Sequence, residues 1–376
     1  MRFALNPFAE RSLYTAEEAQ IVSLESAARA REEIRRWPDY EVTPLRSLAG
    51  LAAQLTVGEV LYKDESQRLG RGSFKALGGA YAATLRLQSY AGPDPALCCA
   101  TDGNHGLSVA YAAKRHGCRC VVFMHEHAHE GKVAAIRELG ARIIRTAGTY
   151  DDSVQTAARA AADEDWLLVA DTSADPRDPT TLHVMQGYGV MVLELLEQLG
   201  TTDAPSHVFI QAGVGGLAAS VAGVLSEHYS KERPTCVVVE PETAACLLES
   251  NIRLRPAKVE GDLRTEMAML SAGEPSAAAW PLLERRIDAF LAIEDSAALA
   301  ARAEVVAPRN GDPALDVGIS GAAGIAGLMQ VRGSSKLSRL LGLSRHSRIV
   351  VFGTESGRED HLTGCRHLSS SNVACP

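Results

Sequence analysis

The most constraining feature of this sequence is an alternation of short apolar runs with helical segments between residues 96 and 171. The apolar runs are ALCCAT (96–101), CRCVVFMH (118–125), ARIIRTAG (141–148) and WLLVAD (166–171). The segments between them have the pattern of helices, and glycine follows two of them, at Gly117 and Gly140. Strands that alternate with helices predict a parallel sheet covered by helices on both faces.

The alternation resumes after a polar, proline-broken segment at 173–181, which we interpret as a crossing between two domains. Its later parts are a helix near 185–199, HVFIQAG, LAASVAGVLSEHY, TCVVVEPE and RIVVFGTES (348–356). We predict an α/β chain of two domains, each an open, mostly parallel sheet flanked by helices. The large domain comprises 1–85 and 174–360, the small domain comprises 86–173, and 361–376 form a C-terminal tail.

A further helix is predicted near the start of the chain, over residues 15–36. Thr15 is followed three residues later by Glu18, which is the pattern of a capping box. Trp37 and Pro38 end the helical pattern.

Length and composition exclude several classes of protein. The chain has 376 residues, 46% hydrophobic and 22% charged, which is enough for two cores. Its net charge of -8 argues against a nucleic-acid or anionic-membrane partner. The start shows no leader pattern and no apolar run reaches about 18 residues, so we expect a cytoplasmic protein without a membrane span. None of the eight cysteines forms a C-x-x-C pair, so we predict free thiols and no metal site.

Three glycine- or lysine-bearing loops lie where a predicted strand ends or a helix begins, which is where open parallel sheets bind ligands. The first, QAGVGGLAAS (211–220), can hold a phosphate with backbone N–H groups and a helix dipole. Gly213, Gly215 and Gly216 let the backbone approach an anion. The loop also fits G-x-G-x-x-A, and Glu240 ends the next strand as a ribose-binding acid would. An NAD-binding oxidoreductase is therefore an alternative.

The second loop is TDGNHG (101–106), at the junction of a strand and its helix. Thr101 and Asp102 occupy cap-like positions, and one of them would be enough to cap the helix. The loop adds an asparagine and a histidine beside the exposed helix N–H groups. We predict a site here for a substrate carboxylate and a proton-transfer group.

The third loop is KDESQRLGRGSFKALGG (63–79), in which Lys75 lies just inside a helix. Its neighbours Phe74, Ala76 and Leu77 are apolar, so we expect the lysine to face inward. Burial lowers the pKa of a lysine, which is what a Schiff-base lysine requires.

In this order the three loops resemble those of the tryptophan-synthase-beta-like (fold-type II) pyridoxal-phosphate enzymes, over roughly residues 40–360. The resemblance is closest to the diaminopropionate ammonia-lyases. It rests on TPLRSLAGLAAQL, VLYKDESQRLGRGSFKALGGAYA, TDGNHG, VADT (169–172), VMQGY (184–188), VVVEPETAACL and SAGEP. It implies the cofactor pyridoxal 5'-phosphate, a small amino-acid substrate and a homodimer.

The resemblance also implies the cofactor contacts. Lys75 aligns with the lysine that carries the cofactor as a Schiff base, and Phe74 would pack near the ring. Asn104 would donate a hydrogen bond to the phenolic oxygen, and Thr354 or Ser356 would face the pyridine nitrogen. A hydroxyl there leaves the pyridine unprotonated, which favours elimination over transamination. The phosphate loop would be formed by Gly213, Val214, Gly215, Gly216 and Leu217.

Two acids narrow the implied substrate to 2,3-diaminopropionate. Asp102 and Asp171 align with acids of the diaminopropionate enzymes, whereas a generic threonine dehydratase would usually have serine in place of Asp102. Lys75 and Asp102 would share the α-proton chemistry from opposite faces, and Asp171 would hold the β-ammonium. Thr101, Gly103 and His105 complete the predicted substrate site. The product would be 2-aminoacrylate, which hydrolyses to pyruvate and a second ammonia.

Two departures from the family pattern leave alternatives open. Ala322, in SGAAG (320–324), stands where a glutamate is usual, and Arg71 stands where an apolar or small residue is commoner. One alternative is a serine/threonine-type dehydratase or a β-replacement enzyme on another β-substituted alanine. Another is a protein that binds the cofactor without turnover. The cation at Arg71 would favour a substrate with an extra anionic group.

Overall fold

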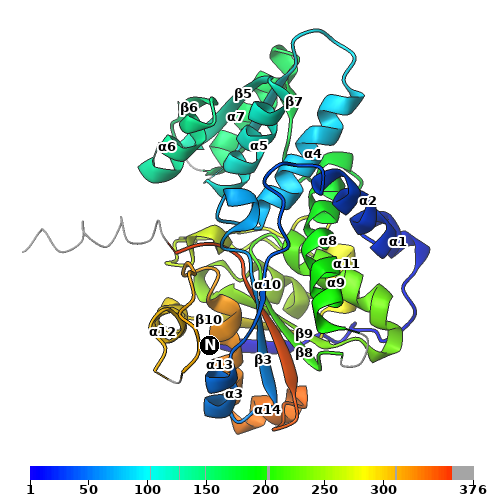
Figure 1. Cartoon of the computed structure of the whole chain (residues 1–376), viewed down its shortest axis with the longest axis vertical. Helices are drawn as coiled ribbons and strands as arrows, with labels where there is room; N and C mark the ends of the chain where they lie inside the picture. The colour runs from blue at the N-terminus through cyan, green and yellow to red at the C-terminus, as the bar shows by residue number, and fades with distance from the viewer. Residues whose placement is uncertain (102, 127, 149, 201–203, 310, 358–376) are drawn as a thin grey trace, which may run out of the picture.

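The computed structural model describes residues 1–101, 103–126, 128–148, 150–200, 204–309 and 311–357, and its strands form two separate sheets (Figure 1). Every neighbouring pair of strands is parallel except β1–β10 and β2–β3, which lie at the two edges of the larger sheet. The predicted class, an α/β chain with open, mostly parallel sheets, is confirmed.

The larger sheet runs, in spatial order, β1 (Arg2–Leu5), β10 (Ala289–Ile293), β9 (Thr235–Pro241), β8 (His207–Gln211), β11 (Arg348–Gly353), β3 (Glu59–Asp64) and β2 (Leu45–Ser47). The smaller sheet runs β6 (Arg142–Thr146), β5 (Arg119–His125), β4 (Ala96–Ala100) and β7 (Leu167–Leu168). The chain therefore passes between the sheets within residues 65–95 and 169–206. The boundaries at 85 and 173 remain predictions.

Helices cover both faces of the larger sheet because its strand residues point alternately to two cores. Phe209 and Val237 point to one core, with α3 (Ala49–Leu55), α12 (Asp295–Val306), α13 (Ala323–Arg332) and α14 (Ser335–Leu341). Val208 and Val238 point to the other, with α2 (Leu24–Ile34), α8 (Pro179–Leu199), α9 (Gly216–Tyr229) and α11 (Trp280–Arg286). The remaining helices are α1 (Ala16–Ile21), α4 (Lys75–Ser89), α5 (Asn104–His116), α6 (Glu130–Glu138), α7 (Tyr150–Asp163) and α10 (Cys246–Arg253).

The smaller sheet joins the second of these cores with one of its faces only. Cys99 and Val122 point to that core, where α5 and α6 pack. Cys98 and Phe123 point to a separate small core beneath α7. We call each sheet with its covering helices a lobe. Figure 1 shows the lobe of the smaller sheet above the lobe of the larger sheet, with α4 between them. The described cysteines are free thiols, as predicted, and Cys365 and Cys375 lie outside the described residues with the predicted tail.

Local signals account for two differences from the predicted elements. The helix predicted over 15–36 is two helices, because Ser23 is extended and caps α2 with a second capping box to Ser26. The predicted capping box of Thr15 and Glu18 is confirmed in α1. Helix α8 begins at Pro179, inside the segment interpreted as a crossing between domains, because Asp178 caps it and proline suits the first turn. Strands β1, β2 and β10 were not predicted.

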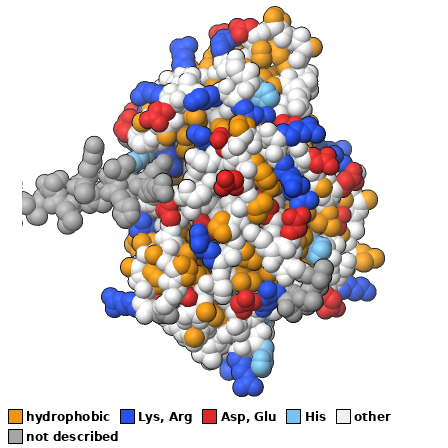
Figure 2. Space-filling view, viewed as in Figure 1, with side chains coloured by type: hydrophobic (Ala, Val, Ile, Leu, Met, Phe, Trp, Pro, Cys, Tyr) orange, Lys and Arg blue, Asp and Glu red, His pale blue; other side chains and the backbone are white. Residues whose placement is uncertain are grey.

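None of the helices among the described residues combines the length and the hydropathy that crossing a bilayer requires. On the face shown in Figure 2, acidic and basic side chains are interspersed. The absence of a nucleic-acid partner stays a prediction from the net charge.

Candidate active site

The predicted site residues follow the carboxyl ends of parallel strands in both sheets, where ligands bind in open α/β folds. Lys75 starts α4 after the loop that leaves β3, and Asn104 starts α5 after β4. Asp171 follows β7, and Thr354 follows β11. The loop Gly213–Leu217 connects β8 to α9. The fold thus brings segments from five strands to the junction between the lobes.

An ion pair between Lys75 and Asp171 lies at the centre of this junction. The Lys75 Nζ is 2.5 Å from Asp171 Oδ2, across 96 residues of sequence. Burial alone would lower the pKa of Lys75, but Asp171 outweighs burial, and together with Tyr188 it raises that pKa above its usual value. Burial likewise opposes ionisation of Asp171, but Lys75 and His105 hold the Asp171 pKa below its usual range. The lowered lysine pKa expected from the sequence is therefore wrong for Lys75 while it is paired with Asp171.

The loop after β4 gives its residues different surroundings. Thr101 Oγ1 accepts the backbone N–H of Gly103 at 2.9 Å and that of Gly106 at 3.1 Å, so it caps the turn into α5. His105 Nε2 lies 2.8 Å from the Val169 carbonyl oxygen, and burial lowers the pKa of this imidazole. His105 thus holds the segment that leads to Asp171. Its role in substrate binding, like those of Thr101 and Gly103, stays a prediction. Asp102 lies outside the described residues.

The loop Gly213–Leu217 fits a phosphate. None of its five backbone N–H groups donates a hydrogen bond to a described residue, and they precede or open the 14-residue helix α9. Gly215 has φ +98, and a Cβ there would lie 2.5 Å from Leu283 Cδ1. At Gly216 a Cβ would make only ordinary contacts. Unpaired N–H groups at a helix N-terminus are the donors that an anion needs.

The two hydroxyl residues after β11, Thr354 and Ser356, have different hydrogen-bond partners. Thr354 Oγ1 accepts a hydrogen bond from Gln211 Nε2 at 2.9 Å and is buried, so its own proton remains available to another acceptor. Ser356 Oγ donates to the Asp316 carboxylate at 2.8 Å, away from that arrangement. The surroundings of Thr354 therefore fit a donor to a pyridine nitrogen better than those of Ser356.

A chain of hydrogen bonds joins the two lobes at Asn104. Lys132 Nζ, on α6, donates to Asn104 Oδ1 at 2.7 Å, and Asn104 Nδ2 donates to Glu355 Oε2 at 2.8 Å. The Phe74 backbone N–H donates to the Thr354 carbonyl oxygen at 3.1 Å, beside an antiparallel bridge between Ser73 and Glu355. These bonds orient the Asn104 amide, with its Nδ2 on the large-lobe side.

The two departures from the family pattern lie close to this chain of bonds. Ala322 is buried, and Glu355 lies against the same turn, because a Cβ at Gly318 would be 2.9 Å from Glu355 Oε1. The turn therefore has a carboxylate from another part of the chain. Arg71 lines an opening of about 180 Å³ with Lys132, while its guanidinium lies 5.0 Å from the Tyr111 ring centroid. Its recognition of an extra anionic group stays a prediction.

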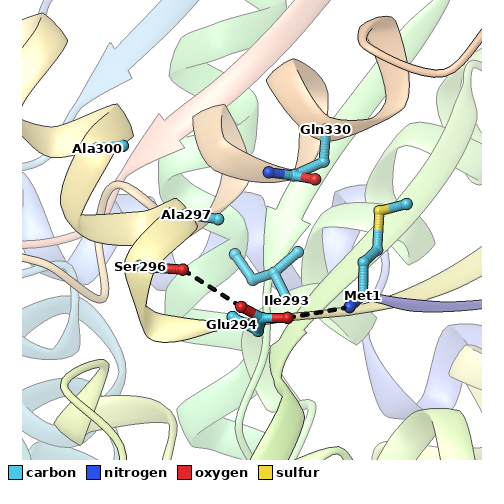
Figure 3. A pocket seen from close by; sticks show the side chains of 7 residues that line it. All are labelled: Met1, Ile293, Glu294, Ser296, Ala297, Ala300 and Gln330. Atoms are coloured by element: carbon cyan, nitrogen blue, oxygen red, sulfur yellow. Dashed lines mark hydrogen bonds and ion pairs between the residues drawn. The ribbon is translucent and has the colours of Figure 1, made fainter.

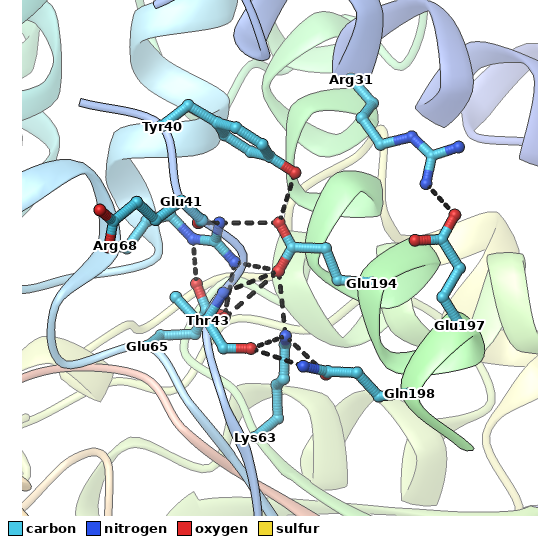
Figure 4. Close-up of polar contacts among 10 residues, drawn as sticks. All are labelled: Arg31, Tyr40, Glu41, Thr43, Lys63, Glu65, Arg68, Glu194, Glu197 and Gln198. Atoms are coloured by element: carbon cyan, nitrogen blue, oxygen red, sulfur yellow. Dashed lines mark hydrogen bonds and ion pairs between the residues drawn. The ribbon is translucent and has the colours of Figure 1, made fainter. Parts of the chain in front are cut away.

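A buried ion cluster of Lys63, Glu65, Arg68 and Glu194 anchors the loop that leads to Lys75 (Figure 4). Glu194 Oε2 accepts from Arg68 Nη2 at 2.6 Å and from Lys63 Nζ at 3.0 Å. Arg68 Nε donates to Glu65 Oε2 at 2.7 Å. Two cations and two anions are thus enclosed together, which is how buried charges are tolerated.

Two further features carry no part of the site. Both oxygens of Glu240 accept backbone N–H groups, of Leu247 and Leu248, each at 2.8 Å, so this buried carboxylate caps α10 and does not face a ribose. A hollow of about 240 Å³ lies near the N-terminus, and its one lining acid, Glu294, is paired with the amino group of Met1 (Figure 3). Its lining is Met1, Ile293, Glu294, Ser296, Ala297, Ala300 and Gln330.

Sequence reasoning missed four residues of the junction: Lys132, Tyr188, Gln211 and Glu355. Tyr188, Gln211 and Glu355 stand in segments that were singled out, VMQGY, QAGVGGLAAS and RIVVFGTES, but no local pattern marks these three residues as parts of a site. Lys132 looks like an ordinary helix residue. Only the packing of distant segments reveals them.

Comparisons with known proteins point to the same cofactor. A family model described as pyridoxal-phosphate dependent enzyme matches residues 37–354. The diaminopropionate ammonia-lyase of Escherichia coli (strain K12) is 34% identical over 369 residues, 92% of each chain. The biosynthetic L-threonine dehydratase of Haemophilus influenzae is 30% identical over 210 residues, 55% of this chain and 37% of that protein. The crystal structure of the Escherichia coli ammonia-lyase with an aminoacrylate-PLP azomethine reaction intermediate has TM-score 0.87 and 32% identity, and the match covers 97% of both chains.

Proposed function

Because this chain belongs to the family of pyridoxal-phosphate-dependent enzymes, we propose that it eliminates ammonia from 2,3-diaminopropionate. The products are pyruvate and two molecules of ammonia. The observation that carries the substrate is the carboxylate of Asp171, 2.5 Å from the Lys75 amine. An acid at this place can bind the second amino group of a diamino acid, which the hydroxyl substrates of dehydratases lack.

The residues that would hold the cofactor are those whose hydrogen-bonding groups fit it. Lys75 would carry it, and the N–H groups of Gly213–Leu217 would hold its phosphate. Asn104 would donate to the phenolic oxygen, with Lys132 and Glu355 orienting its amide. Thr354 would donate to the pyridine nitrogen. Pyridoxal phosphate, when bound, withdraws electrons from the α-carbon and so makes its proton acidic.

Asp171 would control the charge of Lys75 during elimination. While Asp171 is paired with Lys75, the lysine is held as an ammonium and cannot act as a base. A substrate β-ammonium offers Asp171 a second cation. Once Asp171 binds it, burial favours the neutral lysine amine, which can take the α-proton. Asp102, outside the described residues, is the base we propose for the opposite enantiomer.

The proposed reaction is tested by its stoichiometry. Purified holoenzyme is given each enantiomer of 2,3-diaminopropionate, and pyruvate and ammonia are measured together. We expect two ammonia per pyruvate, and a lower kcat/KM for serine and threonine. Faster turnover of serine or threonine would assign the chain to the dehydratases. Cofactor binding without any turnover would show a protein that only binds pyridoxal phosphate.

The substitution Asp171→Asn tests how the substrate is recognised. A charge-assisted contact in a desolvated site is worth about 2–5 kcal/mol, so kcat/KM for 2,3-diaminopropionate should fall by on the order of 10²-fold. The matched control substrate is β-chloroalanine, which has no β-ammonium. The kcat/KM of Asp171→Asn for β-chloroalanine should fall much less. An equal loss with both substrates would show that Asp171 acts on Lys75 alone.

We also propose that the chain forms a homodimer in the cytoplasm, as the family resemblance implies. Light scattering of the purified holoenzyme measures the mass in solution and so tests the homodimer directly. A monomeric mass at micromolar concentration would contradict it.

A further inference from the structure

Tyr188, on helix α8, places a phenol beside Lys75 and Asp171. Only 2% of the residue is exposed. Its hydroxyl makes no hydrogen bond of standard geometry with a described residue, although it lies near enough to Lys75 to raise the pKa of that lysine. Its ring packs on Phe74, with the two ring centroids 4.7 Å apart. Burial raises the pKa of Tyr188 to about 12, so the phenol is neutral near pH 7.

A close contact between α4 and α8 brings this phenol to the site. A Cβ at Gly187 would lie 2.8 Å from the Gly78 Cα. A Cβ at Gly78 would lie 2.4 Å from Tyr188 Cε1. Glycine inside a helix costs stability, and here two glycines face each other where the helices cross. The two glycines let the Tyr188 ring reach the first turn of α4, where Lys75 stands.

The Tyr188 hydroxyl indicates that this residue forms its hydrogen bond only at a later stage of the reaction. Buried hydroxyl groups in folded proteins are almost always hydrogen-bonded, because an unpaired one costs free energy. Tyr188 faces Lys75, whose ammonium is occupied by Asp171. When Asp171 turns to a substrate ammonium, the Lys75 amine needs another partner, and Tyr188 is a neutral one.

We propose that Tyr188 is a positioning residue for Lys75, whose phenol oxygen accepts a hydrogen bond from the Lys75 amine while that amine takes the α-proton. This inference rests on the proposed elimination. In that step the α C–H bond breaks and its proton goes to Lys75, while its electrons form the Cα–Cβ double bond. The Cβ–N bond breaks, and its electron pair leaves with ammonia. A phenol can aim the amine lone pair without holding the amine as an ammonium, as a carboxylate does.

The groups that face Lys75 come from several elements. Asp171 follows β7, His105 lies on α5 and Tyr188 lies on α8, and the thiol of Cys99 on β4 is near enough to Asp171 to be affected by it. Of these, Tyr188 raises the pKa of Lys75 less than Asp171 does. Loss of the phenol should therefore lower the pKa of the lysine base and move the acidic limb of the pH profile to lower pH.

The test is Tyr188→Phe in the holoenzyme, which keeps the ring and removes only the hydroxyl. We expect kcat for 2,3-diaminopropionate to fall about tenfold, KM to change little and the acidic limb of kcat to move to lower pH. The melting temperature should be unchanged or higher, because the variant removes an unpaired buried group. The matched control is Tyr81→Phe. Tyr81 is also a buried tyrosine, but it lies on α4 and packs on His183.

A second measurement separates this inference from the proposed substrate. Apoprotein is mixed with pyridoxal phosphate without substrate, and the pH at half-maximal coupling rate is read from absorbance. Tyr188→Phe should move that pH downward even if the wild type does not release ammonia from 2,3-diaminopropionate. An unchanged kcat with unmoved pH profiles would overturn the inference. A fall in kcat that tracks a fall in melting temperature, with unmoved profiles, would make Tyr188 structural and also overturn it.

Discussion

Replacing Lys75 with alanine is expected to abolish elimination and the covalent capture of pyridoxal phosphate together. Lys75 starts α4 at the junction of the lobes, where its amine faces Asp171 and Tyr188. Without this amine the cofactor has no attachment and the α-proton has no base on that face. A positioned base alone contributes about 10²–10⁴-fold, so we expect kcat to fall by at least about a thousandfold. Turnover and the long-wavelength absorbance of lysine-bound cofactor report the two losses.

Two further variants separate attachment from charge. Lys75→Arg keeps a cation beside Asp171 but lacks a nucleophilic amine, so it should be as inactive as Lys75→Ala. Lys231→Ala removes an exposed lysine and should behave as the wild type. Borohydride reduction followed by peptide mass mapping should place the cofactor on the peptide that contains Lys75. Attachment to another lysine, or retained turnover in Lys75→Ala, would refute the assignment of the active-site lysine.

Removing Glu194 is expected to have the largest effect on stability. Glu194 is 1% exposed, and its carboxylate receives hydrogen bonds from Lys63, Arg68 and Tyr40. Burial opposes its ionisation, but Arg68 and Lys63 outweigh burial and hold its pKa below the usual value. Glu194→Ala leaves two buried cations with Glu65 as their remaining acid. Breaking such a cluster costs about 3–5 kcal/mol of the free energy of unfolding. Chemical denaturation of the apoprotein measures this loss.

The matched control lies one turn further along the same helix. Glu197 pairs with Arg31 at the surface, and its side chain is 63% exposed, so Glu197→Ala should cost less than about 1 kcal/mol (Figure 4). Because the pKa of Glu194 is depressed in the folded state, its contribution is present above its unfolded pKa and is lost as pH falls through the folded value. The difference between the two variants should therefore shrink in acid. Equal losses for Glu194→Ala and Glu197→Ala at neutral pH would contradict the role of the cluster.

Much of the architecture could be predicted from neighbouring residues. The alternation of apolar runs and helical segments predicted parallel sheets, because strand and helix periods are set within a few residues. The loops around Lys75, Asn104 and Gly213–Leu217 could be placed for the same reason, since each directly follows a strand or opens a helix. The break between α1 and α2 was not predicted, because Ser23 lies inside an otherwise continuous amphipathic pattern.

The arrangement of the site depended on segments far apart in the chain. Lys75 meets Asp171 across 96 residues, and this contact reversed the lysine pKa expected from burial. Gln211 distinguishes Thr354 from Ser356, and a pair of glycines brings Tyr188 to Lys75. The sequence by itself determined the alternation of strands and helices and which loops carry the chemistry, because those signals are local. Only the tertiary structure decided which charges and hydroxyl groups face one another, because that depends on how two sheets and their covering helices pack.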